Sequence, residues 1–420
     1  TGVRCWYLEV INMSASPIDR LAAAHPDLEI WWDSSPLYYG KWVEKTLNSA
    51  APEVRPNLED QLRRFYNPQD PSASIVRGCT TNPPLSLSAV KSDPDLWNRW
   101  IDNLILDSPG LTSEELTWLT YKEVLTRGAE MMLPIWQKSK GRFGWISGQL
   151  DPRLFTEKKV MIARAEELSA LSPNVMIKVP ASAEGIEVLQ ALAAEGISTN
   201  TTVCFTLPQI LASARATLQG LNMQQKGSYY LPEKVDPTKW RAVITMMIGR
   251  LTENEALVMQ AGRRGIRLTW QERHWLGIAV FQRAYRILKQ EGYPSKMLAC
   301  SMRQGPLVAG KSKFWDLEKL SGEVVFTCPP YVLEPLLDIG DDLVFEDIES
   351  VEVPQQVLDR LLQIPYAIQA YDPNGLSMEQ FNTHPATVDT VAGFSKAMTG
   401  LEDYIDRRMA IVKGGDLVAA

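Results

Sequence analysis

A single lysine lies within an apolar five-residue stretch, Val175–Val179, that a proline closes. Side chains alternate between the two faces of a strand, so Lys178 shares its face with Met176 and not with Ile177. If both faces are buried, the loss of water lowers the pKa of the ammonium group. A neutral amine attacks a carbonyl carbon and forms a Schiff base. The alternative is that Lys178 protects an exposed edge strand against aggregation.

Other common catalytic groups are sparse or widely spaced. The three histidines form no HxH or HxxxH pair, and the five cysteines form no CxxC pair. These spacings argue against a histidine-based metal site, a histidine-centred triad and a disulfide framework. We therefore expect no metal ion and no cofactor, small buried thiols that serve packing, and a reducing compartment such as the cytoplasm.

The composition excludes several classes of partner. The chain of 420 residues is 45% hydrophobic, carries a formal net charge of −7 and has a pI near 5.3. It has no run of lysine and arginine, which argues against binding to nucleic acid or to an anionic membrane surface. The chain contains no stretch of about 18 apolar residues, so the sequence predicts no membrane span.

Eight short strand patterns alternate mostly with helical ones. They cover residues 28–33, 74–84, 145–152, 175–179, 197–205, 241–247, 296–302 and 323–327, counting the turns after the second and third strands. This order is typical of a parallel α/β fold, the (β/α)8 TIM barrel. A doubly wound open sheet is the alternative, but neither G-x-G-x-x-G nor G-x-x-x-x-G-K-[ST] occurs.

The domain organisation follows from the same patterns. No linker divides the chain, so we expect one barrel domain over residues 1–420. Residues 219–239 are polar and rich in breaker residues, which predicts an inserted loop. Residues 350–420 contain two helical patterns beyond the eighth strand, which predicts a helical C-terminal extension.

Polar residues recur where the predicted strands end, and barrel enzymes carry their chemistry at that end. The positions are Asp33, Thr81, Asn82, Gln149, Lys178, Asn200 to Thr202, Thr245, Ser301 to Arg303 and Thr327. A packed core would avoid these residues unless each has a partner. The pattern therefore favours a reactive Lys178, although Asp33 by itself is also compatible with a helix cap.

Several of these segments resemble motifs of the transaldolase family, in the same order along the chain. They are Thr80–Pro83 (TTNP), Ile177–Ala181 with Glu184–Ile186, Asn200–Thr206, Ile244–Arg250 and Ser301–Gln304. One TTNP would be a weak signal, but the ordered set around a fourth-strand lysine is specific. The resemblance implies a sugar-phosphate transferase of carbohydrate metabolism, such as the pentose phosphate pathway.

The resemblance also implies a role for each matching residue. Lys178 would form the Schiff base with a ketose, and Asp33 would be the general acid/base. Gln149 and Thr202 would hold the catalytic water, while Asn82 and Asn200 would bind the donor hydroxyls and the carbinolamine. Ser301, Arg303 and Arg250 would grip a phosphate. Thr81 and Thr245 complete the expected substrate-binding set. Small sugar phosphates are the expected partners, with a homodimer as a candidate assembly.

Two positions depart from the family pattern. Gln149 stands where many transaldolases carry glutamate, and an amide orients water but takes no proton from it. Fructose 6-phosphate aldolases resemble this chain at that position, but they carry a tyrosine where this chain has Met247. The functions left open are transaldolase, an aldolase that uses free dihydroxyacetone, a specialised transaldolase with an unusual acceptor, and a barrel that binds sugar phosphate without turnover.

Overall fold

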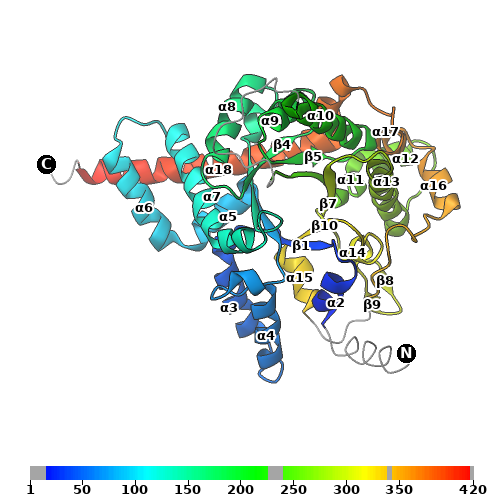
Figure 1. The fold of residues 1–420 in the computed structure, drawn as a ribbon, viewed down its shortest axis with the longest axis horizontal. Helices are drawn as coiled ribbons and strands as arrows, with labels where there is room; N and C mark the ends of the chain where they lie inside the picture. The colour runs from blue at the N-terminus through cyan, green and yellow to red at the C-terminus, as the bar shows by residue number, and fades with distance from the viewer. Residues whose placement is uncertain (1–15, 226–239, 338–342, 417–420) are drawn as a thin grey trace.

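The computed structural model describes residues 16–225, 240–337 and 343–416. Eight parallel strands close into a barrel in the order β1-β10-β7-β6-β5-β4-β3-β2, and helices surround it (Figure 1). The strands are β1 (Glu29–Trp32), β2 (Gly78–Thr81), β3 (Trp145–Gln149), β4 (Val175–Pro180), β5 (Thr199–Cys204), β6 (Ala242–Met247), β7 (Ser295–Cys300) and β10 (Val325–Cys328). The predicted (β/α)8 fold is therefore confirmed.

Each predicted strand segment overlaps one barrel strand, but the second strand begins later than expected. The backbone N–H groups of Ile75 and Val76 bond to Arg64 and Phe65, at the end of the preceding helix. These residues therefore join a helix to the barrel and leave only Gly78–Thr81 in the sheet. A residue pattern does not distinguish such an extended connection from a longer strand, because both use extended backbone.

An apolar layer fills the middle of the barrel. Trp31, Trp145, Met176, Val243 and Leu298 form one buried cluster from five different strands. A side chain at Gly78 would collide with the Trp31 ring, since its Cβ would lie 2.6 Å from a ring carbon. By strand alternation, the residues two positions further along each strand also point inward, at the carboxyl end of the barrel.

An ion-pair cluster closes the amino end. The Glu29 carboxylate lies 2.5 Å from Arg241 and 2.8 Å from Lys296, and it also accepts a hydrogen bond from the Trp31 indole. Burial alone would raise the pKa of Glu29, but the two cations outweigh it and hold the pKa at about 2. We therefore infer that this charge cluster contributes to stability, because barrel enzymes carry out their chemistry at the other end of the barrel.

Helices cover the outside of the barrel, and one small hairpin lies beside it. The helices are α2 (Pro17–Ala23), α3 (Tyr39–Ser49), α4 (Arg55–Phe65), α5 (Pro83–Ser92), α6 (Pro94–Asp107), α7 (Ser113–Lys138), α8 (Lys158–Ser169), α9 (Ala183–Ala194), α10 (Leu207–Gln225), α11 (Ile248–Thr252), α12 (Glu255–Gly262), α13 (Trp270–Gln290), α14 (Trp315–Glu318), α15 (Pro330–Leu336), α16 (Gln355–Leu361), α17 (Pro365–Tyr371) and α18 (Pro385–Asp416). The hairpin pairs β8 (Leu307–Val308) with β9 (Lys311–Ser312). Within the described ranges, no helix has the length and apolarity needed to cross a membrane.

Two helices differ from the sequence predictions. Helix α5 begins at Pro83, where a polar turn was expected, because prolines fit a first helical turn and the Asn82 side chain caps it. Helix α10 continues through Gln225, so the loop predicted from residue 219 is helical over its first part. Residues 226–239 of that predicted loop lie outside the described residues.

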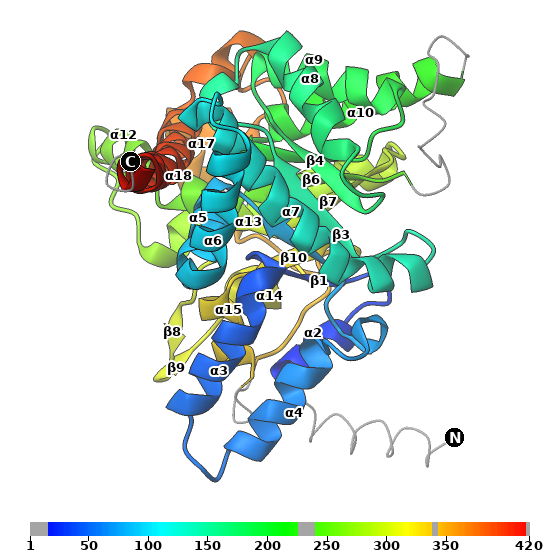
Figure 2. The same cartoon turned by 90° about the vertical axis from the view of Figure 1, so that its left-hand side faces the viewer.

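An aromatic cluster anchors α3 and α4, which project from one side of the barrel (Figure 2). The rings of Tyr39 and Trp42 lie 5.5 and 5.0 Å from the ring of Trp32. Phe65 and Tyr66 at the end of α4 pack against Tyr39. Helices α3 and α4 therefore bury their aromatic side chains against the first strand.

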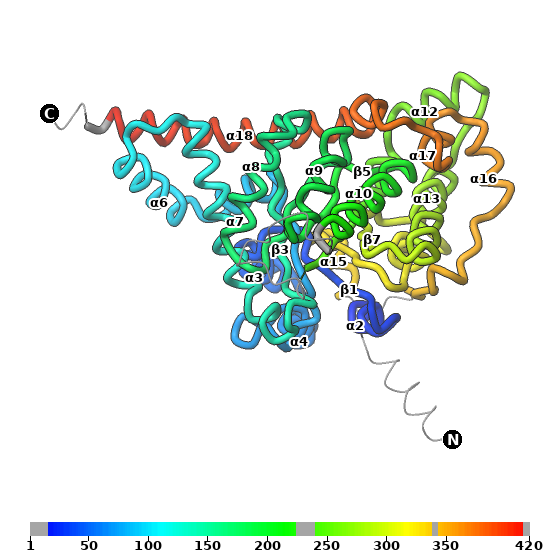
Figure 3. The backbone as a smooth tube through the Cα atoms, turned by 45° about the horizontal axis from the view of Figure 1, so that its top comes forward, coloured from blue at the N-terminus to red at the C-terminus, as the bar shows by residue number. Residues whose placement is uncertain are grey.

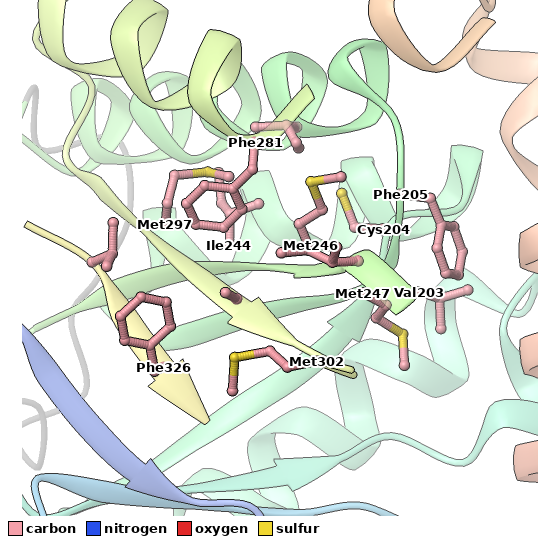
Figure 4. Close-up of a cluster of buried hydrophobic side chains, with 14 of the residues drawn as sticks. Val203, Cys204, Phe205, Ile244, Met246, Met247, Phe281, Met297, Met302 and Phe326 are labelled. Atoms are coloured by element: carbon pink, nitrogen blue, oxygen red, sulfur yellow. The ribbon is translucent and has the colours of Figure 1, made fainter. Parts of the chain in front are cut away.

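Further buried apolar residues lie around β5, β6, β7 and α13 (Figure 4). Ile244 and Met246 from β6 belong to this cluster, as does Phe281 from α13. Met247, the last residue of β6, is also buried and belongs to the same cluster as Val203. The residue that departs from the aldolase pattern is therefore part of an apolar wall.

The last helix runs across the molecule and returns the chain to the barrel (Figure 3). Helix α18 contacts β5 and α11 near its beginning, and it packs against α5, α6 and α7 further along. Arg153, just after β3, bridges Asp151 and Glu402 of α18 with distances of 2.7 and 2.6 Å. The predicted C-terminal extension therefore contacts the elements that follow the barrel strands.

Candidate active site

Lys178 lies inside the barrel, directly above the apolar layer. Its side chain is 1% exposed, and Met176, which shares its face of β4, belongs to the interior cluster. In the sheet, Lys178 pairs with Gln149 of β3 and Asn200 of β5. Its amine makes no hydrogen bond within the described residues. The edge-strand alternative is wrong, because β4 has a neighbouring strand on each side.

Asp33 follows β1 and faces the same interior. The Thr80 hydroxyl donates a hydrogen bond to Asp33 Oδ1, and it lies 3.2 Å from the hydroxyl of Thr327. Burial raises the pKa of Asp33, and this effect exceeds the opposing effects of Lys178, the Thr80 hydrogen bond and Arg250. A carboxyl group whose pKa moves toward neutrality is a better proton carrier at physiological pH.

The two threonines at the end of β2 face opposite sides. Thr80 points inward to Asp33, so strand alternation turns the Thr81 side chain outward, and the Thr81 carbonyl accepts a hydrogen bond from Tyr121 of α7. The sequence prediction selected Thr81, and the structure places Thr80 in the interior instead. Asn82 caps α5, with its Oδ1 accepting from the backbone of Leu85.

Two buried polar groups next to Lys178 lack partners. Gln149 Oε1 and Thr202 Oγ1 have no hydrogen-bond partner in the part of the chain that the structure describes. The Gln149 backbone N–H bonds to the Tyr121 hydroxyl at 2.6 Å, which holds the end of β3 in place. Leaving a buried polar group unpaired is unfavourable, so both atoms are suited to bind water or substrate hydroxyls.

Strand β5 is irregular where it contributes Thr202. Its pairing with β6 shifts register between Thr201 and Cys204, and Val203 has a φ of 50°. A β-branched residue rarely adopts positive φ, because its side chain collides with its own backbone. Such strain persists where packing over-determines it and often re-aims a side chain at a functional site. Here the strained residue directly follows Thr202.

A hydrogen-bonded chain connects three strands beside the lysine. The Asn200 amide donates to the Ser147 hydroxyl at 2.9 Å, and the Thr245 hydroxyl donates to Asn200 Oδ1 at 2.6 Å. Asn200 and Thr245 were predicted site residues, and the structure brings them together. Ser147 was not selected from the sequence, although it lies two residues before Gln149 on the same face of β3.

Two of the three residues predicted to bind phosphate, Arg250 and Arg303, line a surface pocket of about 420 Å³ after β6 and β7. Arg250, Arg303 and Glu253 line it, together with residues of α18. Glu253 accepts a hydrogen bond from Arg303 Nε at 2.6 Å. The Arg303 guanidinium also donates to the carbonyl and hydroxyl oxygens of Ser301 at 2.7 and 3.2 Å. Ser301 itself has a φ of 58°, a strained value for a residue with a side chain.

Arg250 differs from Arg303 in its surroundings. Its guanidinium lies over the Phe394 ring of α18, 5.2 Å from the ring centre, and makes no hydrogen bond within the described residues. Burial lowers the pKa of Arg250, against the raising effects of Cys300, Tyr331 and Asp33. The charge of Arg250 lowers the pKa of Asp33, so the two side chains lie within electrostatic range of each other.

A buried pair that the sequence analysis missed supports Arg303. Asp316 Oδ2 accepts a hydrogen bond from the Arg303 backbone at 2.9 Å, and its Oδ1 lies 2.6 Å from His274 Nε2. Both side chains are buried, and the His274 ring stacks on Trp270. The two residues are 42 positions apart, so no local pattern could reveal their contact.

Comparison with known proteins identifies the family. A model of the transaldolase/fructose-6-phosphate aldolase family matches residues 70–403. The chain belongs to this family. It is 34% identical to a transaldolase of Thermobifida fusca over 36% of this chain and 41% of that protein. A transaldolase of Arthrobacter sp. is 30% identical over 47% of this chain and 54% of its own length.

A longer match is to a transaldolase of Mycobacterium bovis, which is 27% identical over 67% of this chain and 76% of that protein. The matches to the first two relatives span less than two thirds of those proteins. Asp33 lies before the residues that the family model matches. Membership of the transaldolase/fructose-6-phosphate aldolase family therefore rests on the chain from β2 to α18.

Proposed function

We propose that this chain is a transaldolase-type transferase that moves a dihydroxyacetone unit through a Schiff base on Lys178. The single observation that carries the proposal is the buried Lys178 beside Asp33, whose pKa burial raises. Membership of the family and the names of its relatives support the same reaction class. The proposed donor is a ketose phosphate, and the acceptor is an aldose phosphate or another aldehyde.

The proposed reaction begins when the Lys178 amine attacks the C2 carbonyl of the donor. Protonated Asp33 gives its proton to the carbinolamine hydroxyl, which leaves as water and yields the protonated imine. The imine withdraws electrons from the neighbouring carbon. The Asp33 carboxylate takes the proton of the C4 hydroxyl while the bond between C3 and C4 breaks. The products of this step are a free aldehyde and an enamine attached to Lys178.

The second half reverses these steps with a new aldehyde. The enamine C3 attacks the acceptor carbonyl, and protonated Asp33 returns its proton to the new alkoxide. Water then hydrolyses the imine, its proton passes to the Asp33 carboxylate, and the longer ketose is released. Because the imine serves as the electron sink, no metal ion or cofactor enters the proposal. Gln149 and Thr202 have the unpaired polar atoms that would position the water.

A second candidate is an aldolase that releases free dihydroxyacetone. The observation that favours it is Gln149 in place of the glutamate of many transaldolases, because fructose 6-phosphate aldolases resemble this chain at that position. Met247 counts against this candidate. It lies in an apolar wall and provides no hydroxyl at the position where those aldolases carry a tyrosine. Product analysis separates the two: a transferase gives a longer ketose with an added aldehyde, and an aldolase releases dihydroxyacetone without one.

The experiment is to trap the imine. The protein is incubated with fructose 6-phosphate, reduced with borohydride and mapped by peptide mass spectrometry. We expect an adduct on Lys178 and none in Lys178→Met, which removes the amine but keeps an unbranched side chain. If the wild-type protein yields no adduct with fructose 6-phosphate or dihydroxyacetone, both candidate functions are excluded and a barrel that binds sugar phosphate without turnover remains.

A further inference from the structure

Helix α18 contributes part of the pocket that contains Arg250 and Arg303. Asp389 and Thr390 of this helix line the pocket opposite the segment that follows β6. Asp389 accepts a hydrogen bond from the Asn254 amide at 2.8 Å, which ties the helix to that segment. Phe394, one turn further along α18, supports the guanidinium of Arg250. The C-terminal helix is therefore one wall of the pocket.

The hydroxyl of Thr390 is one of three buried helical threonine hydroxyls, with those of Thr117 and Thr387, that have no partner among the described residues, and of these three residues only Thr390 lines the pocket. Thr46, Thr120 and Thr126 each donate to the carbonyl four residues earlier, at 2.7 to 2.9 Å. Thr390 is 1% exposed, and its Oγ1 has no partner among the described residues. A buried hydroxyl without a partner is unfavourable, so a partner supplied by a ligand would relieve this cost.

A phosphoryl group bound in this pocket would require further uncharged hydrogen-bond donors. Arg250 makes no hydrogen bond within the described chain, while Nε and another nitrogen of Arg303 are already bonded to Glu253 and Ser301. The carboxylates of Glu253 and Asp389 only accept hydrogen bonds when ionised, so they cannot contact a phosphoryl oxygen favourably. A threonine hydroxyl can donate to such an oxygen without adding charge.

We propose that Thr390 of α18 is a ligand for the phosphoryl group of the substrate, together with Arg250. This inference rests on the proposed function, because it assigns the phosphate end of that substrate to the pocket. Threonine in a helix uses two χ1 rotamers, so rotation about one bond moves its hydroxyl to a different position around Cβ. The side chain can therefore turn its hydroxyl into the pocket without movement of the helix.

The test is Thr390→Val, which keeps the shape of the side chain and removes the hydroxyl. We expect the inhibition constant of inorganic phosphate and the KM for erythrose 4-phosphate to rise about tenfold, because a hydrogen bond to a charged group is lost. The KM for unphosphorylated erythrose and the kcat should stay within about twofold. Thr390→Ser, which retains the hydroxyl, should restore phosphate affinity.

Thr387→Val is the matched control. Thr387 is also fully buried on α18 with an unpaired hydroxyl, but it is not one of the residues that line the pocket. If Thr390→Val and Thr387→Val have the same effect, or if erythrose and its phosphate lose affinity equally, the assignment of Thr390 is wrong. Borohydride trapping on Lys178 with saturating fructose 6-phosphate tests the proposed function separately in the same variants.

Discussion

The hydroxyl of Thr80 donates a hydrogen bond to the carboxylate of Asp33, joining the ends of β2 and β1 inside the barrel. This bond lowers the pKa of Asp33 against the larger raising effect of burial. Thr80 therefore helps to set the proton affinity of the proposed acid/base, a role that the sequence motif alone did not assign to it.

Replacement of Thr80 by valine should raise the pKa of Asp33 further, because the opposing hydrogen bond is lost. We expect the acidic limb of the kcat profile to move to higher pH and kcat at neutral pH to fall about tenfold. Thr81→Val, on the outer face of β2, should leave the profile unchanged. An unshifted limb in Thr80→Val would show that another group controls it.

A carboxylate at position 149 should change the fate of the enamine. In Gln149→Glu we expect transfer to erythrose 4-phosphate to rise relative to release of free dihydroxyacetone, by about tenfold, because the variant restores the glutamate that many transaldolases carry at this position. Gln149→Leu should lower both activities because it removes the atom that holds water. Equal product ratios in wild type and Gln149→Glu would contradict a role for this side chain in partitioning.

The ion pair between Glu253 and Arg303 predicts a change in phosphate affinity. Glu253→Gln removes a negative charge beside Arg303, so the inhibition constant of inorganic phosphate should fall about threefold, a modest effect because the pair is partly exposed. Glu255→Gln is the control, since Glu255 lines the same pocket without a hydrogen bond to Arg303. Weaker phosphate binding in Glu253→Gln would instead mean that Glu253 positions the arginine.

The pair of Asp316 and His274 should affect the affinity for erythrose 4-phosphate, because it holds Arg303 in position. Asp316→Ala removes the acceptor of the Arg303 backbone N–H and leaves His274 unpaired. We expect a destabilisation of about 1–3 kcal/mol, measured by urea unfolding. In the protein that remains folded, KM for erythrose 4-phosphate should rise while kcat changes little. Asp316→Asn, which keeps one acceptor, should recover part of the affinity, whereas an effect on kcat alone would refute this positioning role.

The Glu29 cluster predicts the dependence of stability on pH. The pKa of Glu29 is lowered from 4.5 to about 2, so the ionised form is favoured in the folded state. Its contribution to stability is present above pH 4.5 and is lost as pH falls from there toward 2. Glu29→Gln should lower stability at pH 7 by about 3–5 kcal/mol, because Arg241 and Lys296 lose a buried partner.

The same variant separates stability from chemistry. Glu29 lies at the amino end of the barrel, on the far side of the apolar layer from Lys178. At temperatures where Glu29→Gln remains folded, kcat and KM should match the wild type. The difference in unfolding free energy between the two proteins should shrink as pH falls toward 2, and a constant difference would contradict the lowered pKa.

The sequence by itself determined the strands, their chain order and the polar residues at their ends. These features depend on local periodicity, so alternation along β4 correctly placed Lys178 on the face of Met176. The order of the motifs also identified the family before any contact was known. What local pattern did not resolve was the facing of Thr80 and Thr81, because the TTNP motif alone does not show which threonine points inward.

Only the tertiary structure decided which distant residues share one site. Closure of the barrel brings β1 beside β10 and β2, and so places Thr327 and Thr80 around Asp33. The return of α18 places Thr390 and Phe394 beside Arg250, about 140 positions earlier in the chain. Contacts over such separations depend on packing of the whole fold, which no window of neighbouring residues contains.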